Sequence, residues 1–292
     1  MPWVLAMTVH VLLGSSLALW IRHVSNVNKN AFFSIAFFNY IMVFIGGTLL
    51  AMFFNGGKIP PFPNGQASLY ILAEGLLLPT AWVLNYKLIS MVGAANSVIA
   101  GTAGIIATTL LGLVYLSEPV SAVFVLGVCL MLIAIYISFS IGADKNHKVV
   151  SSLWLKVALI SGVALATAFG LMFEKMAVNS MGYSGYYCYG WGMQCVGAFT
   201  IMLVFGRKEL KNISRKTAKY GLSIGLLTVI TGSFFVYALS KGALSSAILF
   251  TSSKITVTVI LAAIILKERN DINKRIIALV FSLTGLLLIL WK

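Results

Sequence analysis

The chain has 292 residues, of which 60% are hydrophobic and 10% charged, with 21 Lys and Arg against seven Asp and Glu. A soluble domain of this size needs more charge on its surface, and the mean hydropathy of +0.97 agrees. The composition predicts an integral membrane protein. It excludes a nucleic-acid-binding protein, whose basic residues would have to gather on a water-facing surface.

Ten apolar runs are long enough to cross about 30 Å of hydrocarbon as helices. In chain order they cover Trp3–Ile21, Ala31–Phe54, Ala67–Tyr86, Ala94–Leu116, Val120–Ile141, Leu153–Phe173, Gly185–Phe205, Tyr220–Leu239, Ala243–Leu266 and Ile276–Trp291. We expect the last run to begin a few residues earlier, because Lys274 and Arg275 can reach the headgroups. The first run is expected to be a true span, since no charged segment precedes it.

The basic residues are divided unequally between the two sides of the membrane. Four lie on the side of the N-terminus, called side A, and sixteen on the opposite side, called side B; Lys254 alone falls inside a span. Cytoplasmic loops carry the excess of Lys and Arg. We therefore expect a multi-pass protein of the plasma (inner) membrane with side B in the cytoplasm and both termini extracytoplasmic.

The two halves of the sequence resemble each other weakly. Glu118 and Glu268 lie 150 residues apart, each between two spans, and the run from Gly93 to Ile99 resembles the run from Gly242 to Ile248. Five spans per half is an odd number, so the halves must be inverted. The predicted fold is an all-α membrane protein with ten transmembrane helices in two inverted five-helix repeats, residues 1–145 and 146–292, and such repeats favour a transporter.

Two motifs carry a resemblance to a known family. A small-residue fourth span that closes on Ser117-Glu118-Pro119, and a ninth span that closes on Lys267-Glu268-Arg269, resemble the EamA-like branch of the drug/metabolite transporter superfamily. The resemblance implies a cavity lined by the first, third, fourth, sixth, eighth and ninth spans, and transport of small metabolites by alternating access. In the nucleotide-sugar branches a ninth-span Lys contacts phosphate. The chain departs from many members at Leu13, where they have Trp, and in the side that carries the basic residues.

Three ionisable residues lie inside spans, where each costs on the order of 2.5–3.5 kcal/mol and is a candidate functional group. They are His10, Glu74 and Lys254. Thr251, Lys254 and Thr258 share one helical face, which predicts a cavity-facing stripe. Lys254 needs an acceptor, either an anionic substrate group or Glu74 in a static pair. Glu74 could hold an amine or carry a coupling proton, and His10 could relay a proton, bind ligand or only bond a carbonyl.

The remaining candidates are weaker. The full predicted substrate-binding set is Lys254, Glu74, His10, Ser252, Ser253, Thr251, Gln194, Trp82, Tyr237 and Asn96, with Glu74 and His10 as the candidates for proton coupling. The aromatic cluster from Tyr183 to Trp191 is interpreted as an interfacial belt, with an aromatic wall of the cavity as the alternative. Glu118 and Glu268 are expected to cap hairpin turns, and Glu174-Lys175 to be a gate or a solvated helix end.

The sequence thus predicts a secondary active transporter of a small polar metabolite, an amino acid or related charged solute, with proton coupling left open. Alternatives are nucleotide-sugar, phosphorylated, cationic amine or drug-like solutes, or a non-transporting receptor or scaffold. No P-loop occurs, and neither paired carboxylates nor a metal-ligand spacing was identified in the spans, so we expect no enzyme, no cofactor and no metal. The expected partners are the substrate and the lipid bilayer, in a monomer or homodimer, without nucleic acid.

Overall fold

The computed structural model describes residues 2–28, 31–92, 94–141, 153–210, 213–265 and 272–290. Within these ranges all regular structure is helical. The helices are α1 (Trp3–Val27), α2 (Phe32–Phe54), α3 (Gly65–Val92), α4 (Ala94–Tyr115), α5 (Ala122–Ile141), α6 (Leu153–Phe205), α7 (Arg207–Leu210), α8 (Arg215–Lys241), α9 (Leu244–Ile265) and α10 (Ile272–Leu290). An apolar run in lipid has to satisfy its own backbone, and a helix does so within one segment.

The predicted sixth and seventh spans are joined in α6 across one residue with a non-helical backbone. This residue is Gly182, with φ 72° and ψ 167°, a conformation open essentially to glycine alone. The sixth span therefore continues beyond Phe173, where the sequence analysis ended it. The expectation that the tenth span begins early is confirmed, since α10 starts at Ile272.

Five helices in the described part of the chain are long and apolar enough to cross a membrane by length and composition. They contain Trp3–Ser25, Phe32–Phe54, Gly65–Leu88, Val157–Phe205 and Arg215–Lys241, and shorter apolar helices cover Ala103–Tyr115, Ala122–Ile137 and Ile276–Ile289. The run Val157–Phe205 is interrupted at Gly182 and supplies two crossings.

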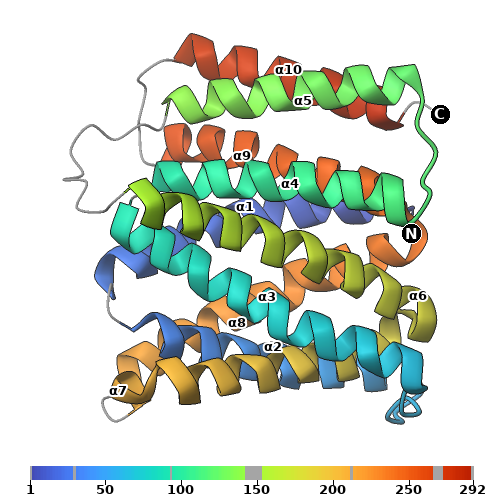
Figure 1. The fold of residues 1–292 in the computed structure, drawn as a ribbon, viewed down its shortest axis with the longest axis vertical. Helices are drawn as coiled ribbons and strands as arrows, with labels where there is room; N and C mark the ends of the chain where they lie inside the picture. Colours follow the sequence, from blue (N-terminus) through green and yellow to red (C-terminus); the bar gives the residue numbers. More distant parts are fainter. Residues whose placement is uncertain are drawn as a thin grey trace.

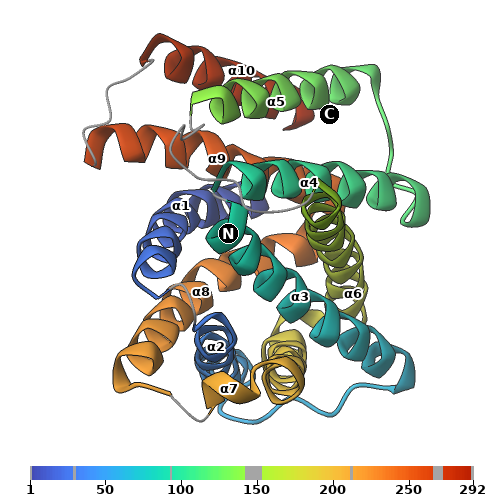
Figure 2. The same cartoon turned by 60° about the vertical axis from the view of Figure 1, so that its left-hand side comes forward.

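The long helices lie side by side in one bundle (Figure 1). Both chain ends are at the edge that corresponds to side A, and α7 is at the opposite edge. Figures 1 and 2 both show α5 and α10 adjacent on one flank, and α4 packs on α9 in the same way. These pairs join equivalent helices of the two halves. The chain is an all-helical membrane protein whose halves are consistent with inverted repeats.

Glycines allow the closest helix crossings. A Cβ on Gly127 of α5 would stand 2.8 Å from the carbonyl oxygen of Gly285 in α10, and a Cβ on Gly285 would stand 2.8 Å from that of Gly127. In the other flank, a Cβ on Gly197 of α6 would overlap the carbonyl oxygen of Gly75 in α3. Pro79, four residues on, has no N–H to bond that oxygen. Small residues at these crossings let the backbones approach, as is common in membrane bundles.

The short helix α7 was not predicted and ties α6 to α2 on side B. The Glu209 carboxylate accepts a hydrogen bond from the backbone N–H of Ser34, at 2.9 Å, in the first turn of α2. Burial raises the pKa of Glu209, and its hydrogen bonds to Ser34 and Phe33 oppose that shift. A carboxylate at a helix N-terminus also complements the helix dipole. Glu209 thus fixes the side-B end of α2.

Candidate functional site

Lys254 lies near the middle of α9, ten residues or about 15 Å past its start at Leu244. Its side chain runs along α1, because a Cβ on Gly14 would stand 2.9 Å from Lys254 Cδ and 3.8 Å from Nζ. Ser15 Oγ shares its hydrogen between the Val11 carbonyl oxygen of its own helix, at 2.8 Å, and the Lys254 carbonyl oxygen, at 3.2 Å, so α1 and α9 are in contact here. The side chain is only half-buried, and no acceptor for its ammonium is found among the described residues. A glycine on α1 thus makes room for an unpaired cation inside the bundle.

His10 lies one helical turn from Gly14 on α1 and is 8% exposed. Its Nδ1 is 2.9 Å from the carbonyl oxygen of Thr231 in α8, and a carbonyl only accepts, so Nδ1 carries the hydrogen. Nε2 is buried and has no hydrogen-bond partner in the part of the chain that the structure describes. Lys254 acts electrostatically on the ring. The structure therefore brings together two of the three predicted ionisable residues.

The hydroxyl groups of α9 bond to their own helix. Thr251, Ser252, Ser253 and Thr258 donate to the carbonyl oxygens of Ala247, Leu249, Phe250 and Lys254, at 2.6–3.0 Å. Ser252 and Ser253 are buried, whereas Thr251 and Thr258 are half-buried like Lys254. Ile255 and Val257 are half-buried as well, so the cavity-facing stripe of Thr251, Lys254 and Thr258 stays a prediction.

Glu74 is fully buried in α3 and bonds to α6. The Tyr186 hydroxyl donates to Glu74 Oε2 at 2.5 Å, and Gln194 Nε2 donates to Glu74 Oε1 at 3.5 Å and to the Tyr186 oxygen at 2.9 Å. Tyr186 and Gln194 come from the segment of α6 after Gly182. The hydrogen-bond partners of the Glu74 carboxyl group therefore come from α6. Among the described residues, no hydrogen bond joins Glu74 to Lys254.

Glu174 is a member of the same cluster that the sequence analysis placed at a helix end. It is 4% exposed, eight residues before Gly182, and acts electrostatically on Glu74 and Tyr186. The prediction of a solvated end at Glu174-Lys175 is wrong, because the helix continues past both residues. The run Met181-Gly182 was the available signal, since glycine marks a turn more strongly than the apolar boundary at Phe173.

Two buried carboxyl groups act on each other in this cluster. Tyr186 has one hydrogen, which it donates to Glu74, and its oxygen accepts from Gln194. Burial and the like charge of the other carboxyl group both disfavour ionisation of Glu74 and Glu174 together. Both carboxyl groups also act electrostatically on buried Tyr40 of α2. The arrangement can hold a proton between two acidic groups away from water.

The turn between α8 and α9 is held by charged side chains from two other elements. Lys175 Nζ donates to the carbonyl oxygens of Leu239, at 2.5 Å, and Gly242, at 2.7 Å. The Glu118 carboxylate accepts from the N–H groups of Leu244 and Ser245, which begin α9. Glu118 therefore caps a helix of the other half and not its own hairpin. Glu268 lies outside the described residues.

The aromatic cluster of α6 is largely internal. Tyr186, Tyr187 and Trp191 are buried, so the prediction of an interfacial belt is wrong for them. Half-buried Tyr183 packs edge to face on Tyr237, with ring centroids 5.6 Å apart. Trp82 stacks on Tyr86 at 5.4 Å, two turns from Glu74 toward side B. The side chain of Asn96 lies outside the described residues.

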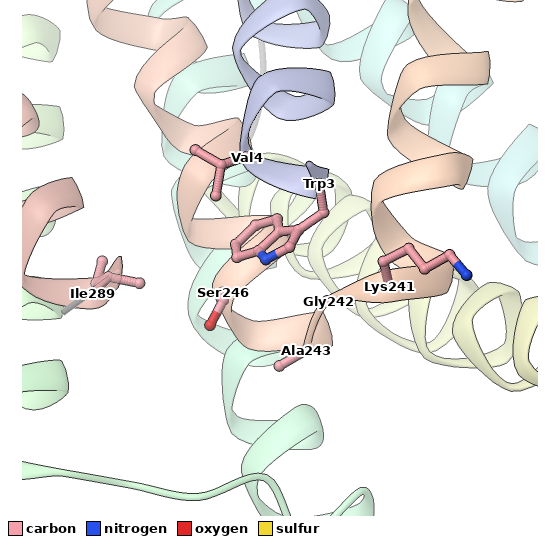
Figure 3. Close-up of a pocket in the computed structure, with 7 residues that line it drawn as sticks. All are labelled: Trp3, Val4, Lys241, Gly242, Ala243, Ser246 and Ile289. Carbon is pink, nitrogen blue, oxygen red and sulfur yellow. The ribbon is translucent and has the colours of Figure 1, made fainter. Parts of the chain in front are cut away.

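A pocket opens at the side-A end of α1 and α9 (Figure 3). Its lining consists of Trp3, Val4, Lys241, Gly242, Ala243, Ser246 and Ile289. The Trp3 ring lies over Ser246, whereas the Lys241 ammonium points away from Trp3. Ser246 is eight residues, or about 12 Å, from Lys254 along α9. None of the predicted site residues lines this pocket, so it is separate from the two clusters above.

Comparisons with known proteins assign the family. A model described as the EamA-like transporter family matches residues 1–140 and 154–291. A search of curated proteins finds no match. A solved structure titled "Crystal structure of protein" has the same fold, with a TM-score of 0.70 and 12% identity over 98% of this chain and 95% of that chain. The family consists of transporters and not of enzymes, and since the matched segments cover nearly the whole sequence, the chain belongs to the EamA-like transporter family.

Proposed function

We propose that the protein is a secondary active transporter that moves a small polar metabolite, an amino acid or related charged solute, by alternating access. The observation that carries this proposal is the half-buried ammonium of Lys254, about halfway across the bundle and without an acceptor among the described residues. An unpaired cation at that depth is costly unless it serves a ligand or a pathway. A carboxylate or another anionic group of the substrate would supply the missing acceptor.

The other predicted substrate-binding residues differ in how close they lie to Lys254. Thr251 shares the half-buried face of Lys254, and His10 lies beside it. Ser252 and Ser253 lie next to Lys254 in sequence and stay proposed ligands, as do Tyr237 and Trp82 toward the two ends of the bundle. Asn96 is retained on the sequence argument alone. We propose that the substrate's anionic group binds Lys254 and that its remainder contacts this wider set.

We propose further that transport is coupled to protons through Glu74. Support comes from the burial of Glu74 and Glu174 within reach of each other's charge, because ionisation of both at once is then disfavoured. Neither carboxyl group forms an ion pair with a Lys, Arg or His side chain in the described ranges, so protonation is the available way to neutralise one of them. Gln194 then serves as a fixed donor of this proton site and not as a substrate ligand.

The substrate role of Lys254 is tested by Lys254→Met in proteoliposomes, with Lys241→Met as the matched control. Lys241 is an exposed lysine of α8 at the rim of the side-A pocket. We expect Lys254→Met to abolish uptake while the purified protein stays monodisperse, and Lys241→Met to transport like wild type. Full uptake by Lys254→Met would overturn the proposed role.

The coupling role of Glu74 is tested by Glu74→Gln, with Glu209→Gln in α7 as the control outside the bundle interior. Glutamine keeps the shape but cannot release a proton. We expect exchange of labelled substrate to persist in Glu74→Gln while accumulation driven by a pH gradient is lost. Unchanged accumulation would assign Glu74 to structure.

We also propose the orientation deduced from the basic residues, in the plasma (inner) membrane. The edge that carries α7 would face the cytoplasm, and both chain ends would be extracytoplasmic. For the assembly we propose a monomer or a homodimer.

A further inference from the structure

Lys254 of α9 and His10 of α1 are neighbours, and one offers a hydrogen-bond donor while the other offers an acceptor. The Lys254 ammonium can only donate, and no acceptor for it is found among the described residues. His10 is more than nine-tenths buried, and its Nε2 has no partner. A buried polar atom without a partner costs free energy, so its persistence in this position asks for a ligand.

The contact with Thr231 decides what Nε2 can do. Because Nδ1 donates its hydrogen to the Thr231 carbonyl oxygen at 2.9 Å, the neutral ring leaves Nε2 with a free lone pair. A hydrogen on Nε2 would add a second positive charge beside that of Lys254, and repulsion between like charges disfavours this form. His10 therefore offers an acceptor next to the donor of Lys254.

The Lys254 side chain and His10 are neighbours along α1. Lys254 Nζ lies 3.8 Å from the position of a Cβ on Gly14, and His10 precedes Gly14 by one helical turn. A ligand that bonds both groups needs an anionic oxygen and a hydrogen-bond donor on one fragment. A carboxylate with a donor on the next carbon is a compact fragment of this kind.

We propose that His10 Nε2 accepts a hydrogen bond from an N–H or O–H group on the carbon next to the substrate carboxylate, so that the site selects 2-amino or 2-hydroxy acids. This inference rests on the proposed function, in which Lys254 holds the anionic group. It adds a specificity-determining role for His10 and narrows the substrate to one arrangement of functional groups. An acid that lacks the adjacent donor would leave Nε2 unpartnered and bind more weakly.

The test uses the purified full chain and matched ligand series in a thermal-shift titration. For each of three side chains, those of alanine, leucine and phenylalanine, the series contains the 2-amino acid, the 2-hydroxy acid, the acid without a 2-substituent and the amino acid methyl ester. In wild type we expect the 2-amino or the 2-hydroxy acid of at least one series to bind about ten- to a hundredfold more tightly than the unsubstituted acid. Comparison of the 2-amino acid with the 2-hydroxy acid in each series distinguishes an ammonium donor from a hydroxyl donor.

Two substitutions of His10 separate its two nitrogens. His10→Asn places an amide nitrogen where Nδ1 donates to Thr231 but has no atom at Nε2, whereas His10→Gln places an amide at the position of Nε2. We expect the preference for the 2-substituted acid to fall below about threefold in His10→Asn and to be kept in part by His10→Gln. Both variants should be monodisperse and unfold without ligand at temperatures close to that of wild type.

The outcomes distinguish this inference from the proposed function. If wild type binds carboxylates but does not prefer the 2-substituted acids, or if His10→Asn keeps the preference, the role of His10 is refuted while the anionic site stands. If methyl esters bind as tightly as the acids, or if no compound of any series binds, the carboxylate role of Lys254 fails and the inference fails with it.

Discussion

The crossing of α3 and α6 beside Glu74 is sensitive to a single methyl group. A Cβ on Gly75 would stand 2.6 Å from Met193 Cγ and 2.9 Å from the Met193 carbonyl carbon and oxygen. Ordinary contacts of a Cβ begin at 3.4 Å. The flexible Met193 side chain can turn away, but its backbone cannot, so Gly75→Ala requires the two helices to separate by about 0.5 Å. Overpacking of this kind costs about 1–3 kcal/mol.

The separation of α3 and α6 would also weaken a hydrogen bond of Glu74. Gln194 Nε2 is 3.5 Å from Glu74 Oε1, at the limit of a hydrogen bond, so a further 0.5 Å, about the separation estimated above, breaks this contact. The bond from Tyr186 to Glu74 starts at 2.5 Å and survives the same displacement. We therefore expect Gly75→Ala to lower the rate of proton-driven uptake without abolishing it.

The matched control is Gly101→Ala. Gly101 is a helical residue of α4 with nothing within 4 Å of a Cβ, so its substitution gains only helix propensity, about 1 kcal/mol. Unfolding in detergent micelles should find Gly75→Ala less stable than Gly101→Ala by about 1–3 kcal/mol. Equal stability of the two variants, with unchanged uptake, would refute the reasoning.

Four further predictions concern the side-A end of the bundle and the topology. Glu118→Ala leaves the first two amides of α9 without an acceptor and should cost about 1–3 kcal/mol in the same unfolding assay, whereas Glu118→Gln should cost less. Lys175→Met should also destabilise, and the double variant with Glu118→Ala should lose less than the sum, because both residues hold the turn between α8 and α9; additive losses would show that they act independently. Gly182→Ala should cost about 1–3 kcal/mol through backbone strain alone, since nothing lies near its Cβ position, and a neutral effect would show that the turn tolerates a side chain. A C-terminal reporter active only outside the cytoplasm should give a signal, and a signal from a cytoplasmic reporter would reverse the proposed topology.

The positions of the helices and the resemblance to the family follow from local sequence patterns. Long apolar runs have few alternatives to helices in lipid, so the ten expected spans lie in helices, and the repeat with its motifs already pointed to EamA-like transporters. The face of α9 that carries Thr251, Lys254 and Thr258 followed from helical spacing, since residues three and seven positions apart point the same way in any helix.

Which polar groups contact each other depends on how the helices pack. Glu74 and Lys254 sit at compatible depths, but pairing depends on which helices are neighbours: α3 packs on α6, whereas α1 packs on α8 and α9. Glu174 was misplaced because hydropathy falls after Phe173, while the helix ends at the backbone break of Gly182. Tyr186 looked interfacial by composition, but it is buried and donates a hydrogen bond to Glu74. Contacts between distant segments follow from packing of the whole bundle, and local patterns carry no information about them.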